Sequence, residues 1–226
     1  MFIDKKFRVP RVWSNKELEK FSAMFSGAIV NVSGWKDLDK EGKKYRDYFC
    51  NNTEYWITNY KSEARGFQGN QENEIFLDLE QDLDEKMHNK FDVVFNHTVL
   101  EHIFNVNKAF ENLCKLSNDI VMVVVPFLQE QHAEYGDYWR FTPLAVKKLF
   151  SQNGYELLYI NYNDASDNSI YVFAIGTKIS QKWNNIKNFN DNKLNKITKH
   201  MIGTKIIKNS LFERIINKIK AKYFKL

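Results

Sequence analysis

The chain has 226 residues, of which 43% are hydrophobic, 15% aromatic and 27% charged, and its formal net charge is +5. This length accommodates one domain of about 150–200 residues and a shorter additional segment, and the aromatic content excludes a largely disordered chain. Two cysteines, Cys50 and Cys114, are too few for a disulfide scaffold or a four-cysteine zinc site, and they fit a reducing compartment.

The charge is distributed unevenly along the chain. Residues 182–226 hold 12 Lys and Arg against 2 Asp and Glu, a net charge of +10, whereas residues 1–181 carry a net charge of −5. The body is therefore mildly acidic, which argues against nucleic acid as a partner. We expect a functional domain over residues 1–181 and a basic tail over residues 182–226.

The sequence carries no sign of membrane insertion or export. No apolar run approaches the roughly 18 residues of a transmembrane helix. The N-terminal sequence also lacks the apolar core of a signal peptide. We therefore expect a soluble, cytoplasmic protein.

The first half of the chain alternates helical and extended patterns. Ser14-Asn15-Lys16-Glu17 has the spacing of a capping box and predicts a helix over residues 15–25. The apolar, β-branched run 28–32 predicts a buried strand, and residues 38–50 predict a polar helix. Three more strands are expected at residues 54–59, 74–79 and 91–95.

The second half continues this alternation. Asn105 predicts the start of a helix that runs to about residue 116. Residues 119–126 are the most apolar stretch and predict a central strand. Thr142 and Pro143 predict the start of another helix, which ends before Gly154. Two late strands are expected at about residues 155–162 and 169–177.

Strands that alternate with helices predict an α/β fold with a doubly wound, mostly parallel, Rossmann-like sheet. The last two strands are joined by only six residues, 164–169, which leaves no room for a crossover helix. We therefore expect a terminal antiparallel hairpin with one reversed strand.

Ligands of such sheets bind beyond the carboxyl ends of the strands. The residues that follow the predicted strands mix small side chains, amides, aromatics and one carboxylate, which suits a nucleoside-like ligand better than a bare phosphate. They are Asn31, Val32, Ser33, Gly34, Trp35, Asn59, Tyr60, Asp78, Leu79, Asn96, His97 and Thr98.

Four segments of the chain resemble class I S-adenosylmethionine-dependent methyltransferases. They are AIVNVSGWKD (28–37), NEIFLDLEQDL (73–83), FDVVFNHTVLEHIFNVNKAFENL (91–113) and DIVMVVVPF (119–127). The resemblance implies S-adenosylmethionine as methyl donor and S-adenosylhomocysteine as product. Within the family, HAEYGDYWRFTPLAVKKLF (132–150) is similar to a subgroup associated with bacterial capsule and surface-polysaccharide biosynthesis.

The resemblance also implies roles for single residues. Asp78 matches the carboxylate that accepts from the adenine amino group, and Asn59 stands where the family has an acidic residue for the ribose hydroxyls. Ser33 and Trp35 stand at two positions that are glycine in the family's first loop, and Asn31 stands for its acidic residue. These departures keep open a non-catalytic binding or scaffold protein.

Methyl transfer to a hydroxyl requires alignment and removal of a proton, and no metal. His132 is our first choice as base, with a structural loop histidine as the equal alternative. Asp137 and Arg140 either bind an anionic acceptor or fix the loop as an ion pair. The remaining candidates for substrate contact are Arg11, Tyr135, Tyr138 and Trp139.

Metal binding is not expected. No His, Cys and Asp cluster has zinc spacing, and Glu130 with Glu134 and Asp137 fits a solvated loop better than a metal site.

Residues 198–226 place Ile at near-helical spacing among lysines, which predicts a basic amphipathic helix. Such a tail adsorbs to the inner face of a membrane, binds a partner, or packs on its own domain or on a second subunit of a homodimer.

Together these features predict an O-methyltransferase acting on a small-molecule or glycan-precursor substrate, at a sugar hydroxyl or a phosphoryl or phosphoramidate oxygen. An N-methyltransferase for an amino sugar is the enzymatic alternative.

Overall fold

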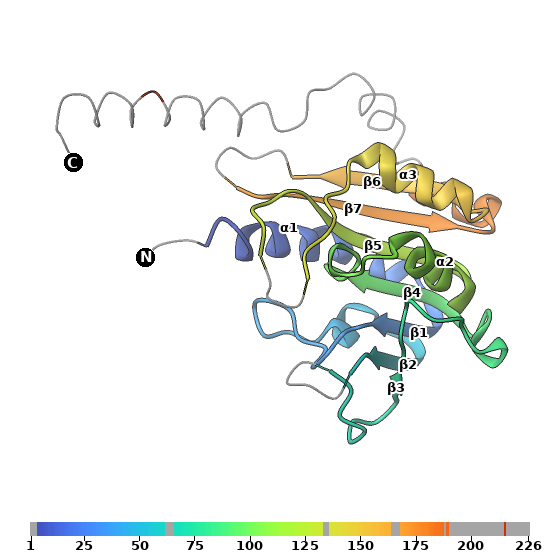
Figure 1. Cartoon of the computed structure of the whole chain (residues 1–226). Helices are drawn as coiled ribbons and strands as arrows, with labels where there is room; N and C mark the ends of the chain where they lie inside the picture. Colours follow the sequence, from blue (N-terminus) through green and yellow to red (C-terminus); the bar gives the residue numbers. More distant parts are fainter. Residues whose placement is uncertain are drawn as a thin grey trace.

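The structure is a computed structural model, and it describes residues 4–61, 66–132, 136–163, 168–187, 189 and 215. Seven strands form one sheet in the order β3-β2-β1-β4-β5-β7-β6 (Figure 1). The strands are β1 (Ser26–Val32), β2 (Asn51–Asn59), β3 (Glu74–Phe76), β4 (Phe91–His97), β5 (Ser117–Leu128), β6 (Glu156–Tyr162) and β7 (Ile170–Thr177).

The strand directions confirm the predicted fold class. β1 pairs in parallel with β2 and β4, β2 with β3, and β4 with β5. β7 runs antiparallel to both β5 and β6, so the chain ends its sheet with the expected reversed strand. The order changes direction between β1 and β4, which places the loops after these two strands at the usual ligand-binding position.

Helices cover both faces of the sheet (Figure 1). The helices are α1 (Arg8–Glu19), α2 (Val106–Leu116), α3 (Pro143–Gln152) and the short α4 (Asn184–Lys187). Side chains of β1 alternate between the faces: Val30 and Val32 pack with α2 and α3, whereas Ile29 packs with α1. This alternation explains why the strand is apolar throughout, as expected for a sheet buried on both sides.

The helix predicted at residues 15–25 is displaced, because α1 spans Arg8–Glu19. The capping-box prediction is therefore wrong. Ser14 lies inside the helix, where its hydroxyl donates to the carbonyl of Arg11 at 2.8 Å, and Glu17 accepts from the hydroxyl of Tyr159 at 2.6 Å. Pro10 lies in the first turn of α1, where a proline is tolerated.

The polar helix predicted at residues 38–50 is also wrong. In place of a helix, the segment contains an isolated β-bridge between Leu38 and Lys44 and the 3₁₀ turn η2 (Tyr45–Tyr48). Asp39 accepts from the backbone N–H groups of Glu41 and Lys43 at 2.7 and 2.9 Å, and these bonds hold a turn in place of a helix. The other 3₁₀ turns are η1 (Ser22–Met24), η3 (Glu85–Met87), η4 (Leu100–His102) and η5 (Ser180–Trp183).

Both predicted helix starts in the second half are confirmed. The side chain of Asn105 accepts from the backbone N–H of Lys108 at the start of α2, and Thr142 accepts from Ala145 at 3.1 Å at the start of α3. These caps satisfy first-turn N–H groups, and they fix where the chain leaves the carboxyl edge of the sheet.

The packed body continues beyond the boundary predicted at residue 181. Trp183 and Ile186, from η5 and α4, are buried in the cluster that also holds α1. The indole N–H of Trp183 donates to Asp119 at 3.0 Å. The tail helix predicted at residues 198–226 lies outside the described residues, except for Ile215. Among the described residues, no helix is long and apolar enough to span a membrane.

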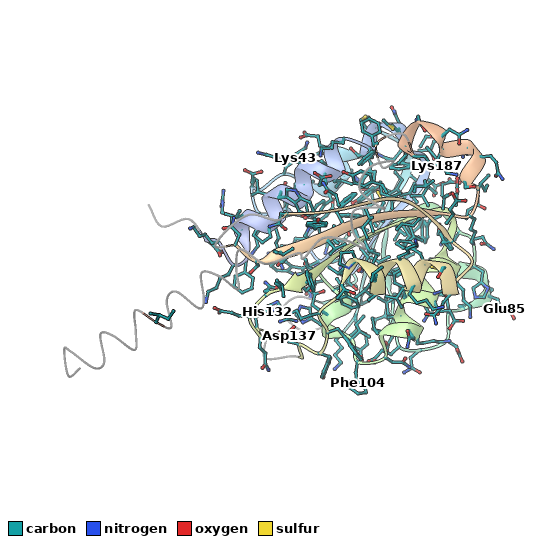
Figure 2. The ribbon with its side chains drawn as sticks, turned by 90° about the horizontal axis from the view of Figure 1, so that it is seen from above. Lys43, Glu85, Phe104, His132, Asp137 and Lys187 are labelled. Atoms are coloured by element: carbon teal, nitrogen blue, oxygen red, sulfur yellow. The ribbon has the colours of Figure 1, made fainter. Side chains whose placement is uncertain are left out.

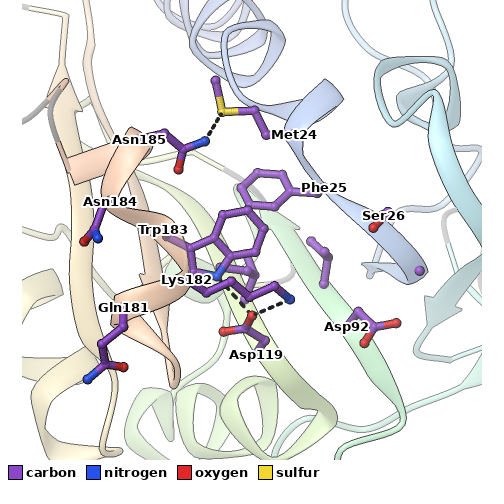
Figure 3. A pocket seen from close by; sticks show the side chains of 13 residues that line it. Met24, Phe25, Ser26, Asp92, Asp119, Gln181, Lys182, Trp183, Asn184 and Asn185 are labelled. Atoms are coloured by element: carbon purple, nitrogen blue, oxygen red, sulfur yellow. Dashed lines mark hydrogen bonds and ion pairs between the residues drawn. The ribbon is translucent and has the colours of Figure 1, made fainter.

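A pocket of about 530 Å³ lies at the amino ends of β1, β4 and β5 (Figure 3). Its acidic side chains serve the fold. Asp92 accepts from the backbone N–H of Ala28 at 2.8 Å, and Asp119 accepts from Trp183 and pairs with Lys182 at 3.4 Å. The pocket is at the end of the strands opposite to the predicted ligand edge, and it is therefore distinct from the predicted ligand site.

Candidate functional site

The loop after β1 is held by the end of β2. Ser33 donates its backbone N–H to the hydroxyl of Thr58 at 3.2 Å, and Gly34 donates to the carbonyl of Thr58 at 3.2 Å. The N–H of Trp35 donates to the side-chain oxygen of Asn59 at 2.7 Å. These bonds give the loop a defined shape at the carboxyl edge of the sheet.

Alternate residues of this loop are left-handed. Ser33, Trp35 and Asp37 have φ angles of 58°, 48° and 59°. Two of these are the positions where the resembled family has glycine. The loop therefore keeps a glycine-like backbone path with side chains that carry a conformational cost, of the order of 1–3 kcal/mol each.

A buried network around Asp37 stabilises this strained path. The carboxylate accepts from the Asn31 amide at 2.8 Å, from the Tyr55 hydroxyl at 2.7 Å and from the Arg46 backbone at 3.0 Å. Burial is the largest influence and raises the pKa of Asp37, although the hydrogen bonds oppose it. The sequence pattern alone did not predict this network. The feature that could have indicated it is a carboxylate six residues after Asn31.

Gly34 is required by packing. A Cβ on Gly34 would lie 2.5 Å from the amide nitrogen of Asn31. Because Asn31 is fixed by Asp37, it has no room to move away. Asn31 and Gly34, both predicted to bind the cofactor, thus serve first to shape the loop.

Asn59 is engaged in internal contacts. It is buried, and besides accepting from Trp35 its amide N–H₂ donates to Glu74 at 2.7 Å and to the Trp35 carbonyl at 3.4 Å. The next residue, Tyr60, is exposed, with its ring centroid 6.0 Å from that of the exposed Phe76. This edge therefore offers aromatic surface to a ligand, whereas the side chain predicted to contact the ribose is already hydrogen-bonded within the protein.

The turn after β3 carries two predicted cofactor residues. Asp78 is half-buried and accepts from the backbone N–H of Glu80 at 2.9 Å. Leu79 is buried, and its carbonyl accepts from Asn112 at 2.9 Å. Of these two residues, Asp78 is the one that presents a side-chain polar group toward solvent.

The residues that end β4 line the centre of the edge. Asn96 is fully buried and donates to the carbonyl of the equally buried Val32 at 3.1 Å, and the backbone N–H of Thr98 donates to Val124 at 2.8 Å. These contacts join β4 to its neighbours β1 and β5. The hydrogen bonds therefore stabilise the carboxyl edge of the sheet from within the protein.

His97 is held as a neutral ring. Its Nε2 lies 2.8 Å from the Ser14 hydroxyl, and its Nδ1 lies 3.2 Å from the Thr98 hydroxyl. Burial and the nearby charge of Arg11 lower its pKa to about 3. His97 therefore has the contacts of a structural residue that packs between α1 and β4.

The second group of predicted residues surrounds the end of β5. Asp137 accepts from the backbone N–H of His132 at 2.6 Å and lies 3.3 Å from its Nδ1 (Figure 2). Burial acts to raise the pKa of Asp137, but the hydrogen bonds from Arg140 and His132 outweigh it and lower the pKa to about 2. An ionised carboxylate thus lies beside one nitrogen of the His132 ring, although that nitrogen makes no hydrogen bond within the described part of the chain.

Arg140 fixes the loop rather than facing an acceptor. It donates to both oxygens of Asp137 at 2.6 and 2.7 Å. It also donates to the carbonyls of Gln129, Glu130 and Trp139 at 3.0, 2.8 and 2.8 Å. These five bonds use the five N–H groups of a guanidinium, which favours the ion-pair alternative over anion binding.

Glu101, which the sequence pattern did not reveal, is the buried carboxyl group of the site. It is fully buried, and neither carboxylate oxygen has a hydrogen-bond partner among the described residues. Burial raises its pKa to about 8, against an opposing effect of its own backbone and of Arg11. The sequence feature that could have revealed it is a glutamate within the mostly apolar segment 99–104, which directly follows a central strand.

Two histidines lie beside Glu101. The Nε2 of His102 is 3.8 Å from a carboxylate oxygen of Glu101, and its Nδ1 is 2.6 Å from the carbonyl of Gly136. The ring centroids of His102 and His132 are 5.2 Å apart. One ligand atom from each of the three residues lies within 4.8 Å of the others.

Arg11 reaches the same region from α1. Its Nε is buried with no partner in the described part of the chain. Its positive charge acts on Glu101 and His97, and it also lowers the pKa of Tyr171 against the stronger raising effect of burial.

An exposed aromatic surface borders this cluster. The ring centroids of Phe104 and Tyr138 are 5.4 Å apart, and those of Phe104 and Trp139 are 6.4 Å apart. The backbone N–H groups of Tyr138 and Trp139 both donate to the carbonyl of Glu101, at 2.7 and 3.2 Å, which ties the aromatic surface to the buried glutamate. Tyr135 lies outside the described residues.

No protein-family model matches the sequence, and none of the curated proteins is similar enough to it to count as a relative. Solved structures do resemble the fold. A Bacillus halodurans protein classed as a methyltransferase superposes with a TM-score of 0.55 at 11% identity, over 72% of this chain and 97% of that one.

Two further structures are similar. Magnesium protoporphyrin IX methyltransferase from Synechocystis, solved with bound S-adenosylmethionine, has a TM-score of 0.52 at 10% identity, over 79% of this chain and 86% of that one. An S-adenosylmethionine-dependent methyltransferase from Clostridium acetobutylicum has a TM-score of 0.51 at 9% identity, over 74% and 91%. The chain thus has the Rossmann-like fold of these methyltransferases.

Proposed function

We propose that this protein is an S-adenosylmethionine-dependent methyltransferase that methylates a hydroxyl of a sugar or glycan precursor. The observation that carries the proposal is the placement of His132 with its carboxylate partner Asp137, 3.3 Å away, at the carboxyl edge of a methyltransferase-type sheet. Neighbours of this fold contain the methyl donor, one of them as bound S-adenosylmethionine. The resemblance of residues 132–150 to capsule enzymes supports the glycan class.

The loops after β1, β2 and β3 offer several groups that could bind the methyl donor. The loop of Ser33 and Trp35 has the left-handed path that lets backbone approach a ligand, and Asp78 and Tyr60 present a carboxylate and an aromatic ring. We propose that these residues hold the adenosine. Asn59 contributes by fixing the loop, because its amide is already bonded to Trp35 and Glu74.

The donor supplies an electrophilic methyl group on a sulfonium, and the protein must align the acceptor and remove its proton. His132 is the residue that we propose as base. An ionised Asp137 beside Nδ1 favours the tautomer with its proton on that atom, which leaves Nε2 to accept the proton of the acceptor.

The aromatic surface supports a sugar acceptor. Phe104, Tyr138 and Trp139 are 68%, 52% and 38% exposed, and exposed aromatic groups of this size mark ligand or partner sites. Sugar rings present apolar C–H faces that pack on such rings, while their hydroxyls remain available for reaction. Because the N–H groups of Arg140 are used within the loop, Arg11 is left to meet any phosphate or uronate of the acceptor.

The first experiment measures binding of the methyl donor's product. S-adenosylhomocysteine at about 100 times its dissociation constant should stabilise the full chain by about 2.7 kcal/mol, seen as a rise in the unfolding temperature. Asp78→Ala should abolish most of this rise, whereas Asp47→Ala, a change at an exposed position of η2, should not. Absence of any shift at millimolar ligand favours the non-catalytic scaffold.

The second experiment identifies the acceptor. Nucleotide-activated sugars, including amino sugars, are incubated with S-adenosylmethionine and the full chain, and a mass increase of one methylene is sought. Location of the methyl group on oxygen supports the proposal. Location on nitrogen establishes the N-methyltransferase alternative instead.

A further inference from the structure

We propose that Glu101, His102 and His132 bind one divalent transition-metal ion of the Zn²⁺, Co²⁺ or Mn²⁺ class. One ligand atom from each residue already lies within 4.8 Å of the others. Two imidazoles and one carboxylate form a set that such ions favour over Mg²⁺ or Ca²⁺. Sequence reasoning expected no metal here, because the three residues come from two loops that only the fold brings together.

The buried carboxylate is the independent observation that points to a cation. Glu101 is 0% exposed, and both its oxygens lack a hydrogen-bond partner among the described residues. An unpaired carboxylate in this environment is costly unless it is protonated or meets a positive charge. A metal ion at this position would supply that charge and occupy the unused oxygen.

The two rings are oriented as metal ligands usually are. The Nδ1 of His102 is 2.6 Å from the carbonyl of Gly136, so that nitrogen carries the proton and Nε2 carries the lone pair. The carboxylate of Asp137 lies 3.3 Å from Nδ1 of His132, without a hydrogen bond to it, and its negative charge favours a proton on that nitrogen. A carbonyl or carboxylate behind each ring is the common outer contact of a ligating histidine.

Gly136 is part of this arrangement. Its φ of 120° is accessible mainly to glycine, and a Cβ there would lie 2.7 Å from the ring of Tyr138. Glycine therefore allows the carbonyl behind His102 and the aromatic surface to coexist. The metal position is connected through this residue to the surface on which we propose that the acceptor packs.

Binding requires a modest contraction. Ligand atoms at about 2.0–2.1 Å from a tetrahedral ion are about 3.3 Å from each other, whereas Glu101 and His102 are 3.8 Å apart and all three ligand atoms lie within 4.8 Å of one another. The side chains must therefore move closer together when the ion binds. Three protein ligands leave a fourth position for water or for an acceptor oxygen.

The metal would change how the acceptor is activated. A ring nitrogen bound to a metal cannot take a proton. In the loaded protein His132 would therefore act as a ligand in place of its role as base, and the ion itself would lower the pKa of a coordinated hydroxyl. The hydroxyl proton leaves to water, the new O–CH₃ bond forms, and the S–CH₃ bond breaks to leave S-adenosylhomocysteine. This role rests on the proposed function; the binding of the metal does not.

Metal binding can be tested without an enzyme assay. Full-length protein is stripped with a chelator and titrated with Co²⁺, and visible absorption and equilibrium dialysis report the site. We expect one Co²⁺ per chain, with absorption bands typical of nitrogen and oxygen ligands, and displacement of Co²⁺ by Zn²⁺. Glu101→Gln, His102→Gln and His132→Gln should each weaken binding by at least tenfold, whereas His88→Gln, at an exposed histidine, should not.

Circular dichroism of each variant confirms that it is folded. If Glu101→Gln does not fold, the test relies on His132→Gln, which changes the least buried of the three side chains. Absence of stoichiometric Co²⁺ on the wild-type chain would overturn the proposal, as would binding that all three substitutions leave intact. Because S-adenosylhomocysteine binding is measured separately, failure of the metal site and failure of the methyltransferase function are distinguishable.

Discussion

Arg140 binds both carboxylate oxygens of Asp137, at 2.6 and 2.7 Å. The same guanidinium also holds the carbonyls of Gln129 and Glu130. It thus joins the strand exit of β5 to the segment that precedes α3. The position of His132, between these two segments, depends on this one side chain.

Arg140→Lys should therefore loosen the site. A lysine ammonium has three donors and no planar fork, so it cannot replace the bidentate contact and three carbonyl bonds together. Loss of hydrogen bonds to a charged group costs about 1.5–3 kcal/mol, measured as the change in free energy of unfolding in urea. Arg8→Lys, at an exposed position of α1, should change it by less than about 0.5 kcal/mol. Equal effects of the two changes would contradict the assigned role.

Asn59→Asp, which introduces the acidic residue typical of the resembled family, should destabilise the protein. The Asn59 amide donates to Glu74 at 2.7 Å, and a carboxylate in its place would oppose a like charge. We expect a loss of about 1–3 kcal/mol in the free energy of unfolding. Adding Glu74→Gln should recover part of it, and a double-mutant cycle measures this coupling. Additive effects would show that Glu74 is not the reason for the asparagine.

The stability of the protein should fall in acid because of His97. Its pKa is about 3 in the folded protein, against 6.5 as the ordinary value. Between these values the unfolded chain binds a proton that the folded protein does not, so stability is complete above pH 6.5 and declines as the pH falls toward 3. The decline from this group is at most ~1.4 kcal/mol per pH unit.

His97→Gln should remove this contribution, and urea unfolding at pH 7 and pH 5 measures it. His88→Gln, at an exposed histidine, is the matched control and should retain the full decline. A pH dependence that is the same in both variants would assign the acid sensitivity to other groups.

Truncation after residue 181 should unfold or strongly destabilise the body. It removes Trp183 and Ile186, which are 8% and 0% exposed in the core. Loss of one large buried side chain costs about 3–5 kcal/mol, a large part of the stability of a typical domain. Truncation after residue 189 should retain a cooperative unfolding transition. Thermal unfolding of both chains compares them, and equal stability would place the boundary at 181 after all.

Phe104→Ala should weaken use of a sugar acceptor while leaving S-adenosylhomocysteine binding intact. The ring is 68% exposed and contacts Tyr138 and Trp139. Once an acceptor is found, its KM should rise with little change in kcat, since the contact is present both before and during the reaction. Leu144→Ala, also exposed but at the start of α3, is the control, and an equal rise in KM for both variants would remove Phe104 from the acceptor site.

The sequence by itself determined which segments form the sheet and that its last strand is reversed. Strand patterns such as the apolar runs at β1 and β5 are local, and the short connection before β7 leaves only one direction for that strand. The caps Asn105 and Thr142 were equally predictable, because a cap needs only neighbours within one helical turn.

Only the tertiary structure decided which of the plausible roles each polar residue takes. Ser14 has the pattern of a cap but lies inside α1 against His97, and Asn59 is turned inward by Glu74. His132 is distant in the chain from Glu101 and His102, and the three meet because β4 and β5 are neighbours in the sheet. Such contacts depend on strand order and burial, and no spacing along the chain encodes the electrostatic cost of an unpaired carboxylate in a buried site.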